Sequence, residues 1–167
     1  MKLIKSVLSS VLMLTAMSTS ISAFEQSGVK EGNNRISASV TLRAPDGGDE
    51  SIQFIGQYGK FITDDIELMV DLFSSTNNSN TVYLLGLGAN YYFMKTPTLT
   101  PYVGAQYYRS GETGNSNRSA NGDKIYLGAH KFLTENFAIT PEAGARFVDF
   151  TEYSESYLNV YLTYFFD

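Results

Sequence analysis

The sequence predicts an all-β protein, an antiparallel up-and-down barrel of eight strands, and three observations lead to this prediction. First, apolar and polar residues alternate along eight segments, as they do in strands that have one apolar face. Second, a tight polar turn that contains a phenylalanine and a threonine recurs three times, at 58–65, 90–97 and 129–136. Third, the strands that leave the last two turns share the sequence Thr-Pro-x-x-Gly-Ala, at 100–105 and 140–145. The repeating unit is therefore a β-hairpin.

A secretory signal is predicted at residues 1–23, followed by one barrel domain at 24–167. Lys2 and Lys5 precede an apolar run at 7–16, which small polar residues follow. This run is shorter than the about 20 apolar residues that a membrane-spanning helix needs. The chain has no cysteine, which excludes disulfides and a lipid anchor on cysteine. Loss of the two lysines with the signal moves the formal net charge from −5 to −7, which argues against nucleic acid as a partner.

The first four strands are expected at 35–43, 52–61, 66–73 and 82–93, because apolar residues occupy every second position in each. Their apolar faces are formed, in chain order, by Ile36, Ala38, Val40 and Leu42; Ile52, Phe54 and Tyr58; Ile66, Leu68, Val70 and Leu72; and Tyr83, Leu85, Leu87, Ala89 and Tyr91.

The other four strands are expected at 100–108, 124–132, 139–147 and 157–166. Their apolar faces are formed by Val103, Ala105 and Tyr107; Ile125, Leu127 and Ala129; Ile139, Ala143, Ala145 and Phe147; and Leu158, Val160, Leu162, Tyr164 and Phe166. Most of the eight segments approach the about 9 to 11 residues that a tilted strand needs to cross a membrane.

The connections between the strands fall into two classes. Short turns contain Thr63, Thr96 and Thr134, whereas longer polar loops are expected at 46–49, 76–80, 111–121 and 150–156. Outer-membrane barrels have this asymmetry, with short periplasmic turns and longer external loops. Aromatic residues gather at both strand ends, as in the two interfacial girdles of such barrels. The expected girdles are Phe61, Tyr91, Tyr92, Phe93, Phe132, Phe137, Tyr164 and Phe166 at the turn side, and Phe73, Tyr107, Tyr108, Phe150 and Tyr157 at the loop side.

The polar face of the strands decides between a soluble barrel with an apolar interior and a membrane barrel with an apolar exterior. An eight-stranded barrel is just wide enough for side chains to fill it, and buried charges are normally paired. Small residues and charges of both signs on one face fit such a narrow lumen. We therefore expect a transmembrane barrel whose lumen contains a charge network of Arg35, Arg43, Glu67, Asp71, Lys124, Glu142 and Arg146.

With the Thr-Pro-x-x-Gly-Ala strands, the phenylalanine-containing turns and the closing strand at 157–166, the chain resembles the small eight-stranded outer-membrane β-barrels, the porin-like family of outer-membrane protein X and the outer-membrane protein A barrel. The resemblance covers nearly all of 24–167. It implies a Gram-negative outer-membrane location and contact with outer-membrane lipid and lipopolysaccharide. It also implies that the barrel-assembly machinery reads a C-terminal signal, although Asp167 follows the last aromatic here. That signal would be Leu158, Val160, Leu162, Tyr164 and Phe166.

Several residues could carry chemistry, but each has a simpler structural explanation. His130, the single histidine, is typical of a hydrolase only beside a serine and an acid. The resemblance implies that lipid A deacylases use a histidine and a serine close together on one membrane-facing strand. The strand expected at 124–132 contains no serine, so we expect His130 to be a buried lumen or interface residue. The acids Glu67, Asp71 and Glu142 are better explained by salt bridges than by acid catalysis or a metal site. We expect no cofactor and no metal.

Two further motifs are weak. The acidic run 46–50 lacks the ligand spacing of a calcium loop and is expected to be a solvated turn. Gly86 and Gly88 lack the third glycine and the helix of a nucleotide-binding motif, and we expect them to make room for aromatic neighbours. The sequence thus predicts a non-enzymatic protein with a structural or surface-interaction role. A narrow porin-like channel and a lipid A-modifying enzyme are the alternatives, and the ligand of the external loops is left open.

Overall fold

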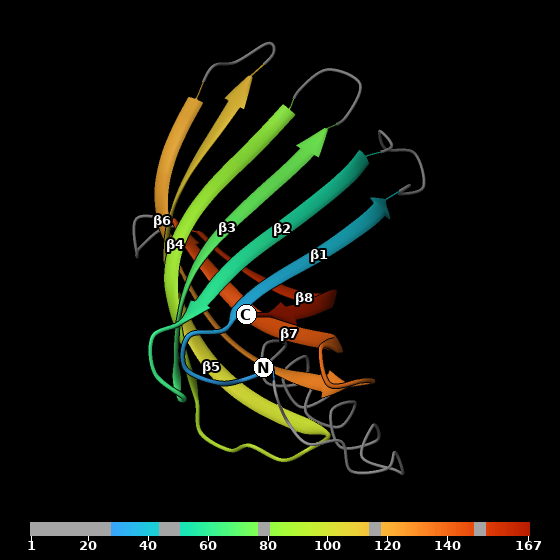
Figure 1. Cartoon of the computed structure of the whole chain (residues 1–167). Coiled ribbons are helices and arrows are strands. Elements are labelled where there is room, and N and C mark those ends of the chain that lie inside the picture. Colours follow the sequence, from blue (N-terminus) through green and yellow to red (C-terminus); the bar gives the residue numbers. More distant parts are fainter. Residues whose placement is uncertain (1–27, 44–50, 77–80, 114–117, 149–152) are drawn as a thin grey trace, which may run out of the picture.

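The computed structural model describes residues 28–43, 51–76, 81–113, 118–148 and 153–167. Within them, eight strands form one closed barrel in which each strand pairs antiparallel with the next and the last pairs with the first (Figure 1). This confirms the predicted fold class. The strands are β1 (Asn34–Arg43), β2 (Ser51–Phe61), β3 (Ile66–Thr76), β4 (Thr81–Tyr92), β5 (Leu99–Thr113), β6 (Arg118–Phe132), β7 (Phe137–Val148) and β8 (Tyr153–Phe166).

The barrel exposes its apolar face and buries its charged one. Val40 and Leu87 are 65% and 63% exposed, whereas Arg35 and Glu67 are 0% exposed. Soluble proteins show the opposite distribution, because water drives apolar side chains inward. An apolar exterior around a polar interior is the pattern of a barrel surrounded by lipid.

Three short turns lie at one end of the barrel (Figure 1), and a threonine organises each of them. The Oγ1 atoms of Thr63, Thr96 and Thr134 accept hydrogen bonds from the backbone N–H three residues later, at 3.0, 3.0 and 3.1 Å. A hydroxyl that bonds its own backbone stabilises a turn locally. The threonine repeated in the sequence therefore has the same structural role each time.

The turn between β4 and β5 is longer than the other two. It spans 93–98, whereas the others span 62–65 and 133–136. Tyr92 is the last residue of β4 and is buried, as Phe61 and Phe132 are at the ends of β2 and β6, whereas Phe93 is the first residue of the turn and is exposed. Phe93 is therefore one position out of phase with Phe61 and Phe132.

The predicted aromatic girdles are wrong in part, because period-2 alternation places several of their residues inside. Phe61, Tyr92, Phe132 and Tyr108 are buried in the lumen. Phe73 and Tyr157 also face it, since the Arg146 guanidinium lies over both rings. Phe150 lies outside the described residues. The exposed aromatics that remain on the outer face are Tyr58, Tyr91, Phe93 and Tyr164 toward the turns, and Phe54, Tyr83 and Tyr107 toward the opposite end.

The loop predicted at 111–121 is also wrong, because β5 and β6 continue through most of it. Their pairing runs as far as Glu112 and Arg118, and the Ser110 hydroxyl donates to the Ala120 carbonyl at 3.2 Å. Each of these strands has 15 residues, more than the about 9 to 11 that a membrane crossing needs. The hairpin therefore projects beyond the apolar belt.

Residues 46–49, 77–80 and 150–152 lie outside the described residues, as does the predicted signal at 1–23. Residues 153–156, expected in a loop, begin β8.

Where β1 meets β8, the pairing comprises five pairs, from Asn34 with Phe166 to Ala38 with Leu162. Among the described residues, no helix is long and apolar enough to cross a bilayer.

Candidate functional site

The lumen contains two linked groups of buried polar side chains. The first, nearer the turns, is built on an ion pair between Arg35 on β1 and Glu67 on β3, with 2.6 Å between Nε and Oε1. Arg35 Nη1 also donates to Ser37 Oγ and Gln57 Oε1 at 2.6 and 3.1 Å. Glu67 Oε2 accepts from the Tyr92 hydroxyl at 2.6 Å and from Asn90 Nδ2 at 2.7 Å. The carboxylate is thus satisfied by three donors, as a buried charge requires.

The second group is built on Lys124 of β6. Its Nζ lies 3.2 Å from Asp71 Oδ2 and 3.1 Å from Glu142 Oε1. Glu142 also accepts hydrogen bonds from three tyrosine hydroxyls, which are Tyr157 at 2.9 Å, Tyr102 at 3.0 Å and Tyr161 at 3.4 Å. The ammonium group of Lys124 lies over the rings of Tyr126 and Tyr157, a favourable cation–π arrangement.

Asn90 joins the two groups. Its Nδ2 donates to Glu67, and its Oδ1 accepts from the Tyr126 hydroxyl at 2.8 Å. The Tyr126 ring in turn lies beneath Lys124, 4.6 Å from Nζ. The lumen is therefore spanned by side chains that contact one another from wall to wall.

His130 belongs to a closed circuit of hydrogen bonds. Its Nε2 lies 3.0 Å from the Tyr92 hydroxyl and its Nδ1 lies 2.8 Å from Thr140 Oγ1. Thr140 Oγ1 lies 2.8 Å from Thr163 Oγ1, which lies 2.9 Å from Ser37 Oγ. Arg35 bonds Ser37 and Glu67, and Tyr92 bonds Glu67, which completes the circuit. It joins β1, β3, β4, β6, β7 and β8.

The circuit assigns the protonation of His130. An arginine only donates and a carboxylate only accepts, so Tyr92 must donate to Glu67 and accept from His130. Nε2 then carries the imidazole proton, and Nδ1 accepts from Thr140. Thr163 and Ser37 donate in the same direction around the circuit. With the neutral Nε2–H tautomer, every hydroxyl proton in the circuit finds one acceptor.

Aromatic rings close the lumen at the turn end. His130 stacks on Tyr92 and Tyr102, with ring centroids 5.6 and 5.0 Å apart. Phe165 meets the edge of His130 at 5.0 Å and lies 5.2 Å from Phe132. These rings form one buried cluster with Phe61 and with Val29, which precedes β1. We call this cluster of Val29, Phe61, Tyr92, Tyr102, His130, Phe132 and Phe165 the aromatic plug.

Glycines on the inner face admit these large side chains. A Cβ on Gly59 would overlap the Glu67 carboxylate, and one on Gly128 would meet the Tyr102 ring. The expectation that Gly86 and Gly88 make room for aromatic rings is wrong, because a Cβ on Gly86 would meet the side chain of Gln106, and one on Gly88 would meet the Ala105 carbonyl oxygen and Gln106.

The structure brings together five of the seven residues expected in the lumen network, as one pair, Arg35 with Glu67, and one triad, Lys124 with Asp71 and Glu142. The guanidinium of Arg146 instead lies over the rings of Phe73 and Tyr157, at 5.2 and 4.9 Å. The side chain of Arg43 lies outside the part of the chain that the structure describes. No cluster of three or more metal-ligating side chains occurs among the described residues.

The tyrosines that complete this network were missed from the sequence. On β6, Tyr126 lies two positions from Lys124 and so faces the same side of the strand. The partners of Tyr102, Tyr157 and Tyr161 on the neighbouring strand each lie an even number of positions from a charged lumen residue of that strand. This even spacing was the feature of the sequence that could have placed their side chains in the lumen. A tyrosine suits either face of a strand, because its ring is apolar and its hydroxyl is polar, so phase alone identifies its side.

The comparisons with known proteins concern the fold. No protein-family model and no curated protein sequence matches the chain. Among solved structures, the N-terminal β-barrel domain of Pseudomonas aeruginosa OprF superposes with a TM-score of 0.65 at 22% identity, covering 81% of this chain and 98% of that one. The outer-membrane protein OprG of Pseudomonas aeruginosa gives 0.60 at 12% identity, covering 85% and 99%.

Neisserial surface protein A is similar with a TM-score of 0.55 at 17% identity, covering 80% of this chain and 94% of that one. The chain has the fold of the small eight-stranded outer-membrane β-barrels. In this outer-membrane barrel fold the closing strand β8 places Leu158, Val160, Leu162 and Tyr164 on the outer face. Phe166 ends the strand opposite Asn34 and is partly exposed.

Proposed function

We propose that the chain is an integral outer-membrane protein with a closed lumen and a structural or surface-interaction role, without enzymatic activity. The fold and the apolar outer face support the membrane location. The short turns then lie in the periplasm and the long β5–β6 hairpin outside the cell, in accord with the asymmetry of such barrels.

The closed lumen rests on one observation, the continuous contact of buried side chains from wall to wall. Ion pairs and hydrogen bonds join Arg35 to Glu67 and Lys124 to both Asp71 and Glu142, and the aromatic plug fills the turn end. An ion that passed through would have to separate these pairs in a site with little water. We therefore favour a non-conducting barrel over the narrow porin-like channel.

A lipid A-modifying activity is disfavoured by the position of His130. Its ring is 0% exposed, both its nitrogens are engaged by Tyr92 and Thr140, and it faces the lumen rather than the lipid. A general base must reach the proton that it removes. No substrate group in the membrane has such access to this imidazole.

The surface role is supported by the β5–β6 hairpin. Its outer part exposes the polar residues Arg109, Thr113, Ser119 and Asn121. A rigid paired hairpin can present a binding surface at lower entropic cost than a flexible loop. For assembly, we propose that the alternating residues of β8 with Phe166 are the signal that the barrel-assembly machinery recognises.

The test is ion conductance across planar bilayers. The mature protein, shown to be inserted and folded by its heat-dependent migration on gels, is expected to give no current steps. A Phe132→Ala/Phe165→Ala variant, which truncates the aromatic plug, serves as the comparison and is expected to leak ions. Steady current through the unaltered barrel would overturn the closed-lumen proposal. Recovery of the protein as a soluble, detergent-free species would overturn the membrane assignment itself.

A further inference from the structure

Ahead of β1, residues 28–33 bend sharply at the turn end of the barrel (blue in Figure 1). The Asn33 N–H donates to the Lys30 carbonyl at 3.1 Å and closes a four-residue turn, in which Gly32 has a φ of +89°. Glycine adopts this left-handed backbone without strain, and asparagine tolerates it better than other residues do. A Cβ on Gly32 would meet no other described residue within 4 Å, so the backbone conformation alone calls for glycine here. We call residues 28–33 the strap.

One end of the strap is held on the β2–β3 hairpin. The Gly32 N–H donates to the Phe61 carbonyl at 3.0 Å, and the Glu31 N–H donates to Asp64 Oδ1 at 2.9 Å. Phe61 is the last residue of β2, and Asp64 lies in the turn that follows it. The strap is therefore fixed to one side of the mouth, which is the turn-end opening of the lumen.

The other end of the strap lies on the aromatic plug. Gly28 packs so closely that a Cβ there would lie 2.8 Å from ring carbons of Phe132 and of Phe165, and the neighbouring Val29 is 5% exposed. Phe132 belongs to β6, which is four strands from β2 in the ring of eight and thus faces β2 across the lumen. The strap therefore spans the mouth from wall to wall.

Fewer bonds hold the strap than hold the strand that follows it. Ten consecutive residue pairs join β1 to β2, whereas the strap depends on the bonds of Gly32 and Glu31 and on the buried side chain of Val29. A segment with few buried contacts opens at a lower free energy than the whole domain. We propose that the strap is a latch that closes the turn-end mouth of the lumen and opens while the barrel stays folded.

Opening of the latch withdraws Gly28 and Val29 from the rings of Phe132 and Phe165. Water-soluble molecules then reach the inner residues next to these rings, whereas the ion pairs that join β1 to β3, and β6 to β3 and β7, are unchanged. The latch forms part of the proposed closed lumen, but the two fail separately. Ion conductance tests the whole lumen, and chemical access tests the mouth alone.

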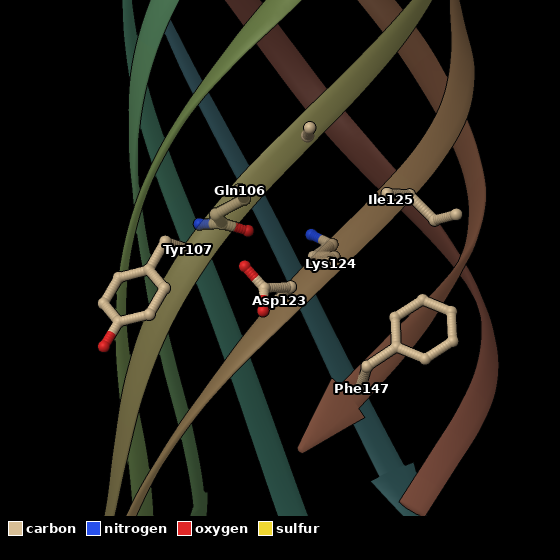
Figure 2. A pocket seen from close by; sticks show the side chains of 7 residues that line it. Gln106, Tyr107, Asp123, Lys124, Ile125 and Phe147 are labelled. Carbon is tan, nitrogen blue, oxygen red and sulfur yellow. The ribbon is translucent and has the colours of Figure 1, made fainter. Parts of the chain in front are cut away.

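The chain has no cysteine, so a single substitution supplies a thiol reporter of access. Ala138→Cys places the thiol in the buried cluster that contains Val29, at a residue that is 0% exposed. Met94→Cys, at a residue 47% exposed in the turn after β4, is the freely accessible comparison. Gln106→Cys is the buried comparison far from the mouth. Figure 2 shows Gln106 beside Lys124, at a pocket of about 470 Å³ in the wall between β5 and β6.

Two substitutions should open the latch by different means, and each has a matched control. Val29→Ser removes the apolar anchor, and Val40→Ser makes the same change on the exposed outer face of β1. Gly32→Ala strains the turn, whereas Gly32→Asn adds a larger side chain that tolerates positive φ. Each is combined with each reporter in the full-length mature protein, folded in detergent and labelled with 2-(trimethylammonium)ethyl methanethiosulfonate. Heat-dependent migration confirms that every variant is a folded barrel.

With the unaltered strap, we expect Ala138→Cys to react far more slowly than Met94→Cys. Gly32→Ala should accelerate it roughly 5- to 30-fold, the factor that left-handed strain of an L-residue gives in an opening equilibrium, and Gly32→Asn should have a smaller effect. Val29→Ser should accelerate it about tenfold through the lost apolar burial, and Val40→Ser should not. The rate at Gln106→Cys should stay the same throughout.

Three results refute the latch. The first is rapid labelling of Ala138→Cys beneath the unaltered strap, and the second is a rate there that no strap substitution changes. The third is equal acceleration at Ala138→Cys and Gln106→Cys, which would mean that the whole barrel loosens. A larger effect of Gly32→Asn than of Gly32→Ala would refute the turn as the part that holds the latch closed.

A second measurement needs no cysteine. Lys30 is exposed, but its carbonyl is bonded within the turn, and proteolysis of a folded segment follows the population that has opened. Endoproteinase Lys-C should therefore cleave the unaltered protein slowly after Lys30 and should cleave the Gly32→Ala variant faster, by the same factor as the thiol labelling. Rapid cleavage of the unaltered protein at Lys30 would overturn the latch, while the conductance of the same protein decides the closed lumen independently.

Discussion

The ion pair between Arg35 and Glu67 allows a quantitative test of the interior. We expect Glu67→Gln to lower the free energy of unfolding by about 3–5 kcal/mol, the range for breaking a buried pair by removing one partner. The carboxylate accepts from Arg35 at 2.6 Å, from Tyr92 at 2.6 Å and from Asn90 at 2.7 Å. The glutamine side chain keeps one acceptor oxygen, but its NH₂ group faces hydrogen-bond donors that have lost their acceptor. It also leaves the guanidinium of Arg35 buried without a counter-charge.

The matched control is the same chemical change in an exposed pair. Asp65 lies 2.7 Å from Lys95 at the turn end, and its side chain is 56% exposed. Asp65→Asn should cost about 1 kcal/mol or less, because water screens surface pairs. Both variants are compared with the unaltered protein by urea titration in phospholipid vesicles, with the folded fraction measured from heat-dependent migration.

A double variant separates the lost charge pair from other effects. Adding Arg35→Met to Glu67→Gln removes the orphaned cation, so the double variant should be less destabilised than the sum of the two single variants. If Glu67→Gln costs no more than Asp65→Asn, the pair is solvated and the argument for a closed lumen fails. Additive single effects would likewise show that Arg35 and Glu67 do not interact.

Three other predictions concern the wall, a turn and the histidine. Leu127→Arg, on the outer face of β6 in the middle of the apolar belt, should cost about 2–4 kcal/mol by urea titration, whereas Leu127→Met should cost much less; equal stability of the two would contradict the face assignment. Thr63→Ala should cost about 1 kcal/mol in the same assay because it removes the acceptor of the Ile66 N–H, and Thr63→Ser should restore most of it. The nitrogen-15 spectrum of His130 should show the neutral Nε2–H tautomer, and a proton on Nδ1 instead would disprove the direction of the hydrogen-bond circuit.

Much of the fold was predictable because its signals are local. Alternation with period 2 identified the eight strands and their outer faces, since a strand's side chains point to opposite sides at every step. The threonine turns were recognised for the same reason, because their hydrogen bonds span three residues. Errors arose where strand pairing continued past the membrane, at 111–121, and where aromatic residues expected in the girdles, such as Phe61 and Phe132, alternate into the lumen.

The lumen was predictable in composition but not in its contacts. The sequence identified the charged residues on the inner face, yet not that Arg35 bonds Glu67 two strands away. That contact depends on the strand register and on Gly59 of the intervening strand, whose missing Cβ leaves space for the carboxylate.

The sequence by itself thus determined the number of strands, the turns and the face that each residue takes, because these follow from neighbours along the chain. Only the tertiary structure decided which inner side chains meet and that aromatic rings close the turn end. Those contacts depend on the shear of the closed barrel, which brings together residues from strands that do not pair.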